Sequence, residues 1–164
     1  MKYLIVLPLL LCAGCEIISY DRTNEDIASE ISGQCFMTLK SSFSYARCGS
    51  ERIKVGFFGA TACLPKDKKE LEMKMALPQC SSGFSLLAKV CDDNYIAMYE
   101  VGTSFMVKKV ISKAMGETGR HWFILGNMKG SVQSVEMPSK WFRPYWVTDE
   151  NITINPEYLA PCSK

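Results

Sequence analysis

The sequence predicts a small, mainly β domain, a barrel or sandwich stabilised by disulfide bonds, with one short helix or other non-β excursion. Several short segments alternate polar and apolar residues with period 2, the pattern of half-buried strands. Glycine-containing turns separate these segments at regular spacing, as in small β-barrels and sandwiches. Apolar residues make up 48% of the 164 positions, enough for a core.

In the first half of the chain, three segments are expected to form strands: 35–39, 42–45 and 52–57. The last of these alternates most clearly, as Arg-Ile-Lys-Val-Gly-Phe. The stretch 64–78 differs because it is rich in Lys, Glu, Leu and Met and contains no β-branched residue. We expect this stretch to be a short helix or an excursion between strands.

The densest β pattern lies at 95–137, where segments 95–99, 104–111, 121–126 and 132–137 are separated by glycine turns. The last three predict a meander, and Trp146-Val147 adds a possible edge strand. The run Gly-Thr-Ser-Phe-Met-Val-Lys-Lys-Val, a turn and then His-Trp-Phe-Ile-Leu resembles the middle strands of bacterial SH3-like barrels over about 40 residues. This resemblance implies such a barrel, built twice or enlarged by an insertion at 64–94.

The N-terminus has the layout of a secretory signal: Lys2, an apolar run over 4–11, and small residues before Cys15. The apolar run is shorter than the roughly 20 residues that a membrane-spanning helix needs. Ala13-Gly14-Cys15 resembles the lipobox of bacterial lipoprotein precursors, although Cys12 stands where that motif usually has Leu. A cleaved export signal that merely contains cysteines is the alternative.

The lipoprotein resemblance implies that residues 1–14 are removed and that Cys15 carries the lipid anchor, so the protein contacts the membrane through its N-terminal lipid. Glu16 follows the anchor, where Asp favours the inner membrane of enteric bacteria, so the outer membrane is favoured, with the domain in the periplasm. We expect residues 15–33 to form the anchor and a polar tether, and 34–164 a single β-rich domain. Within the tether, 23–33 could contain one helical turn.

Six cysteines remain once the signal and the anchor are set aside, an even number that suits a disulfide framework in an oxidising compartment. Their pairing is unknown from sequence, although a hairpin-like Cys35–Cys48 bond is attractive, and Cys162 is expected to hold the C-terminal tail against the domain. No C-x-x-C pair occurs among these six and the only histidine lies far from them, which disfavours a metal site. No cofactor is expected. The six are Cys35, Cys48, Cys63, Cys80, Cys91 and Cys162.

Charge and motifs narrow the functional classes. Lys2 leaves with the signal, so 18 of the 19 basic residues remain against 17 acidic ones, and no strong field favours nucleic acid. No nucleophile elbow, phosphate-binding loop or zinc-protease motif occurs. His121 lies beside an aromatic residue, a setting more typical of a structural histidine than of a catalytic one.

An aromatic segment near the C-terminus is the candidate partner-binding surface, because aromatic residues and Arg dominate binding hot spots. The same rings could instead pack inward and seal the end of a barrel, which is the favoured arrangement. The segment comprises Trp141, Phe142, Arg143, Tyr145 and Trp146.

These features favour a lipid-anchored, non-enzymatic binding or accessory domain that binds an envelope protein or glycan. Immunity, inhibitor and exclusion lipoproteins belong to this class. One alternative is an envelope hydrolase that uses carboxylates, with Asp92, Asp93 or Glu117 as candidates. The other is a structural spacer.

Overall fold

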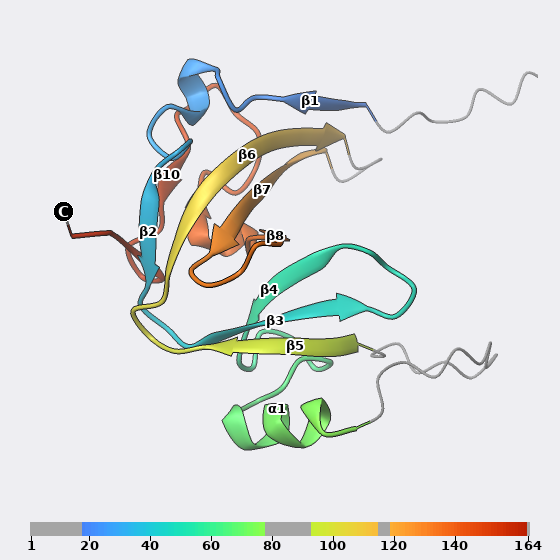
Figure 1. Cartoon of the computed structure of the whole chain (residues 1–164). Coiled ribbons are helices and arrows are strands. Elements are labelled where there is room, and N and C mark those ends of the chain that lie inside the picture. The colour runs from blue at the N-terminus through green and yellow to red at the C-terminus, as the bar shows by residue number, and fades with distance from the viewer. Residues whose placement is uncertain (1–17, 78–92, 115–118, 164) are drawn as a thin grey trace, which may run out of the picture.

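The computed structural model describes residues 18–77, 93–114 and 119–163. Nine strands form one sheet in the order β11-β2-β6-β7-β8-β4-β3-β5, with β1 added on β6, and β9 and β10 form a separate pair (Figure 1). The elements are β1 (Ser19–Asp21), η1 (Asp26–Ala28), β2 (Cys35–Thr38), β3 (Ser42–Arg47), β4 (Ile53–Phe57), α1 (Lys68–Met75), β5 (Asp93–Tyr99), β6 (Ser104–Ala114), β7 (Arg120–Met128), β8 (Ser134–Glu136), η3 (Ser139–Trp141), β9 (Phe142–Arg143), β10 (Thr153–Ile154) and β11 (Leu159–Pro161).

The mainly β prediction is therefore confirmed, as is the β6–β7–β8 meander. The sheet does not close into a barrel. Over the described residues the sheet runs from β11 to β5 without joining these two strands, so it is an open, strongly bent sheet. The bend arises because two long strand pairs, β2–β6 and β3–β5, are connected end to end through short links.

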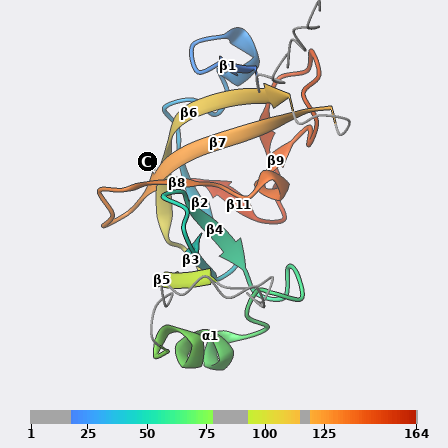
Figure 2. The ribbon, with the colours of Figure 1, turned by 90° about the vertical axis from the view of Figure 1, so that its right-hand side faces the viewer.

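The bend divides the molecule into two lobes, seen one above the other in Figures 1 and 2. The β6–β7 lobe contains β1, β2, β6–β8 and the C-terminal strands, and the β3–β5 lobe contains β3, β4, β5 and α1. Thr38 joins the lobes: it is fully buried, its N–H donates to Thr103 O (3.1 Å), and its carbonyl accepts from Gly102 N (2.8 Å). Gly102 has φ +86°, a conformation that glycine adopts without strain.

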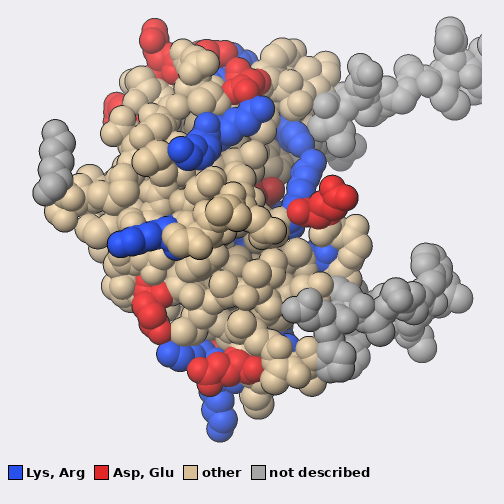
Figure 3. Space-filling view, viewed as in Figure 1, with Lys and Arg blue, Asp and Glu red and all other residues tan. Residues whose placement is uncertain are grey.

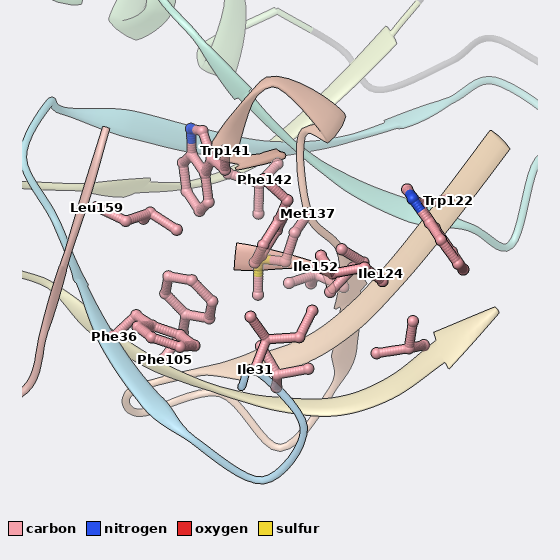
Figure 4. Close-up of a cluster of buried hydrophobic side chains, with 14 of the residues drawn as sticks. Ile31, Phe36, Phe105, Trp122, Ile124, Met137, Trp141, Phe142, Ile152 and Leu159 are labelled. Carbon is pink, nitrogen blue, oxygen red and sulfur yellow. The ribbon is translucent and has the colours of Figure 1, made fainter. Parts of the chain in front are cut away.

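Each lobe has its own hydrophobic core. The smaller core, under α1, is formed by Phe43, Leu64, Leu71 and Tyr95. The larger core fills the β6–β7 lobe (Figure 4) and consists of Ala28, Ile31, Phe36, Val55, Phe105, Val107, Val110, Trp122, Ile124, Met128, Val135, Met137, Trp141, Phe142, Ile152 and Leu159.

The helix expected within 64–78 is α1. Asp67 caps it, with its carboxylate accepting from Glu70 N at 2.8 Å, the N-terminal arrangement that acidic residues favour. Leu71 is fully buried beneath the helix and fixes it against β5. In the part of the chain that the structure describes, no helix has the length and apolar character needed to cross a membrane.

The N-terminal segment differs from the expected tether over 15–33. From Ser19 onward this segment belongs to the domain, because Ser19 pairs with Lys113 and Tyr20 with Ser112 as β1 adds to β6. The following turn buries Ala28 and Ile31 completely in the larger core. The polar residues that suggested a tether lie on the outer side of this segment, and the two buried side chains hold it in place.

The disulfide framework also differs from one expectation. Cys35 is bonded to Cys162 and not to Cys48, since β11 pairs with β2 and Cys162 N donates to Cys35 O at 3.1 Å. The Cys35–Cys48 pair is wrong because the chain passes from one lobe to the other between these residues. Cys48 and Cys63 each take part in a disulfide bond as well, and Cys80 and Cys91 lie outside the described residues.

Candidate functional site: an aromatic cleft between the two lobes

The structure divides the predicted aromatic segment into a buried half and an exposed half. Trp141 and Phe142 are each only 2% exposed and belong to the core, where Trp141 lies against Phe105 with ring centroids 5.4 Å apart. These two rings therefore have the inward arrangement that the sequence favoured. Beyond the exposed Arg143, Tyr145 is 43% and Trp146 50% exposed.

The exposed rings form a cluster with the only histidine. His121 lies 4.5 Å from Trp146 and 6.0 Å from Tyr145 between ring centroids, and the Tyr145 and Trp146 rings meet edge to face at 5.0 Å. An isolated β-bridge between His121 and Trp146 holds this cluster against β7. This bridge replaces the edge strand expected at Trp146-Val147.

The aromatic cluster stands at one side of a cleft of about 670 Å³ between the lobes, which we call the interlobe cleft. One wall comes from β7, β8 and the segment after β8, and the opposite wall from β4 and the loop that follows it. The lining residues are Tyr45, Lys54, Val55, Gly56, Phe57, Ala60, Thr61, Leu64, His121, Trp122, Phe123, Glu136, Met137, Pro138, Ser139, Lys140, Tyr145 and Trp146.

Alternation along β7 explains why this strand serves both the core and the cleft. Trp122 and Ile124 point into the core, whereas His121 and Phe123 lie on the other face of the strand. Trp122 is at the edge of the core, so it also lines the cleft while being only 5% exposed. In Figure 4 its nitrogen lies on the side of the ring toward the blue-green ribbons of β3 and β4.

The Trp122 indole nitrogen, Nε1, has no hydrogen-bond partner among the described residues. A buried N–H without an acceptor costs about 1 to 3 kcal/mol, and tryptophan usually finds a partner when it is buried. Trp122 lines the interlobe cleft, so this buried donor belongs to a residue of the cleft wall.

The charged side chains that line the cleft include one pair that joins the lobes. Lys54 on β4 and Glu136 on β8 face each other at the single parallel bridge between these strands, and their Nζ–Oε1 distance is 3.3 Å. Burial, followed by the negative charges of Asp93 and Glu136, raises the pKa of Tyr45. Tyr45 therefore stays neutral at physiological pH and can donate a hydrogen bond within the cleft.

A second hollow, of about 930 Å³, lies on the other side of Trp122. Its lining is mostly polar and charged, from the turn after β1, the start of β7 and residues 147–151. Arg22 on its wall is already bound to Glu25, at 2.7 Å, and to Ser112. Unlike the interlobe cleft, this hollow has no exposed aromatic ring among its lining residues, so the interlobe cleft is the stronger candidate site.

The remaining predicted site residues do not line the cleft. Asp93 begins β5 opposite Arg47, while Asp92 and Glu117 lie outside the described residues, as does Cys15. No group of three or more His, Cys, Asp or Glu residues in the described ranges could hold a metal ion.

Sequence reasoning missed the wall of the cleft opposite the aromatic cluster. Leu64, Val55 and Lys54 come from the other lobe, and only the bend of the sheet brings them near Trp146. The one available signal was Trp122, a large ring at the end of an alternating strand beside a second aromatic segment. The chain matches no known protein-family profile, no curated protein and no solved structure.

Proposed function

We propose that this chain is a lipoprotein of the bacterial cell envelope, anchored through Cys15, whose domain binds an envelope protein in the interlobe cleft without catalysing a reaction. The lipobox resemblance supports the anchor, and Glu16 favours the outer membrane. The observation that carries the binding role is the half-exposed pair Tyr145 and Trp146 beside the buried, unpartnered Trp122 Nε1.

The chemistry of the cleft favours a protein segment as its occupant. Exposed Trp and Tyr side chains beside an apolar wall have the composition of a binding hot spot. Val55, Leu64 and Met137 supply the apolar wall, and a backbone carbonyl of the bound segment would accept from Trp122 Nε1. A sugar chain fits less well, because its many hydroxyl groups need partners when buried and Lys54 and Glu136 are already paired.

Site-specific photo-crosslinking in cells tests the binding role. A photoreactive phenylalanine analogue placed at Tyr145 should give a protein adduct of discrete mass, because this position lies at the cleft. The same analogue at Val132, which is 96% exposed on the turn between β7 and β8, is the matched control and should give none. Trp146→Ala should weaken binding of the captured protein by at least about 30-fold, the effect of a hot-spot residue of 2 kcal/mol.

Equal crosslinking at positions 145 and 132, or an adduct that is glycan and not protein, would contradict the proposed partner class. The anchor is tested separately with radiolabelled palmitate. Cys15→Ala should abolish incorporation of the label, and a variant that keeps the label would remove the anchor from the proposal.

A further inference from the structure

The described chain begins at one end of the sheet. The Ile18 carbonyl accepts from Ala114 N at 3.2 Å, and Ser19 is in register with Lys113 near the end of β6. Arg22 N donates to Val110 O at 2.8 Å, so the segment from Ile18 to Arg22 is held along β6 by backbone hydrogen bonds. The start of β1 therefore has a fixed position on the domain.

Only three residue steps separate Ile18 from Cys15, and a fully extended chain covers at most about 3.6 Å per step, or about 11 Å in all. The polar headgroup layer of one leaflet is about 5 to 8 Å thick. With a lipid on Cys15, this end of the sheet cannot move away from the headgroup layer. A long flexible tether would have allowed that movement, and the pairing of β1 with β6 excludes one.

The residues at this end have the chemistry of a membrane interface. Ile18 is 51% and Tyr20 43% exposed, and the Tyr20 ring lies between two guanidinium groups, with Arg120 at 4.7 Å and Arg22 at 5.2 Å from its centroid. Lys113 extends over the Phe123 ring at 5.2 Å. Tyrosine, Arg and Lys are the residues that anchor proteins at headgroup level.

Charge at this end is favourable for an anionic surface. Two of the nearby carboxylates, those of Asp21 and Glu25, are paired with Lys109, at 3.1 Å, and with Arg22. Lys113 and Arg120 have no ion pair among those that the described residues form within 4.0 Å. Figure 3 shows Lys and Arg side chains grouped over the ends of β6 and β7, at the upper right.

We propose that Ile18, Tyr20, Lys113 and Arg120 form a membrane-contact rim that binds the anionic phospholipid headgroups of the membrane holding the anchor. The inference rests on the proposed lipidation of Cys15. Each cation brought to such a surface strengthens binding only about five-fold, so the rim orients a domain that the lipid already retains.

The rim also determines how far the interlobe cleft lies from the membrane surface. Ser19, Lys113, His121 and Trp146 are consecutive register partners across four neighbouring chain segments. At about 4.8 Å per strand, Trp146 lies about 14 Å from Ser19. A protein bound in the cleft is therefore engaged close to the membrane surface.

Amine-reactive pulse labelling of the lipidated protein tests the rim. The protein is reconstituted in vesicles of phosphatidylglycerol and phosphatidylethanolamine, or of phosphatidylcholine alone, and acylation of each lysine is followed by mass spectrometry. Lys113 should react about five-fold more slowly on the anionic vesicles, the equivalent of 1 kcal/mol. Lys129 is the internal control because it lies at the opposite end of β7, about 25 Å away along the strand.

Arg120→Gln should remove much of the protection of Lys113, and Arg120→Lys, which keeps the charge, should retain it. Equal labelling of Lys113 on both kinds of vesicle, in protein that floats with them, would overturn the rim and leave the anchor intact. Failure to float would overturn the anchor and the rim together. Neither result depends on the cleft, which crosslinking at Tyr145 tests.

Discussion

Ile31→Ala tests whether the N-terminal segment is part of the fold. Ile31 is fully buried in the larger core, ten residues after β1, in a segment whose polar composition suggested a tether. The substitution removes three carbon groups, and at about 0.8 kcal/mol each the lost transfer energy is about 2.4 kcal/mol. A cavity that the sheet cannot fill adds about 1 to 2 kcal/mol.

The expected loss is therefore about 3.4 to 4.4 kcal/mol, in the upper half of the range of about 2 to 5 kcal/mol for Ile→Ala in protein cores. Urea unfolding of the oxidised protein, followed by circular dichroism, measures it. The matched control is Ile96→Ala, because Ile96 is 42% exposed on β5 and should cost much less. If Ile31→Ala cost no more than the control, the segment would not be docked, and the short reach from Cys15 to the sheet would lose its basis.

Three further predictions concern the sheet and its connections. Gly126→Ala should lower the unfolding free energy by about 1 to 3 kcal/mol in thermal denaturation, because its Cβ would lie 2.6 Å from the Met106 carbonyl oxygen; an unchanged midpoint would contradict this packing. The pKa of Asp21 is lowered to about 2, so its contribution is complete above its ordinary value of 3.8 and is lost as the pH falls toward 2. Asp21→Asn should therefore flatten the stability profile between pH 4 and 2 in acid titration, and parallel profiles would contradict the shift. Replacing Cys35 and Cys162 together by Ser removes a disulfide bond between positions 127 residues apart. The unfolding free energy should fall by up to about 5 kcal/mol under non-reducing conditions. A decrease below about 1 kcal/mol would show that the bond hardly restricts the unfolded chain.

Alternation predicted the strands well because each of them buries one face. The strands β2 to β7 lie where the period-2 segments placed them, within a few residues. β1 escaped prediction because Ser-Tyr-Asp has no buried side chain, and its three residues are all exposed. Its strand conformation comes from pairing with β6, a contact between residues about ninety positions apart that no local pattern reveals.

The candidate site was predictable only in part, for a similar reason. Tyr145 and Trp146 belonged to the predicted segment, but Trp141 and Phe142 in the same segment are buried. The inward rings lie at the end of η3 and the start of β9, whereas the outward rings follow Pro144, and the composition of the segment does not locate this change. The Lys54–Glu136 pair depends on the bend between the lobes and so on the whole sheet.

The pairing of β1 with β6 has a mechanical consequence. With the proposed anchor on Cys15, a force exerted by a bound partner reaches the membrane through β1, along the direction of the strand. The backbone hydrogen bonds of an antiparallel pair lie across that direction, so the three register pairs from Ser19 to Asp21 share the load in shear and do not open one after another. A force applied to the bound partner would therefore be transmitted to the bilayer through the sheet.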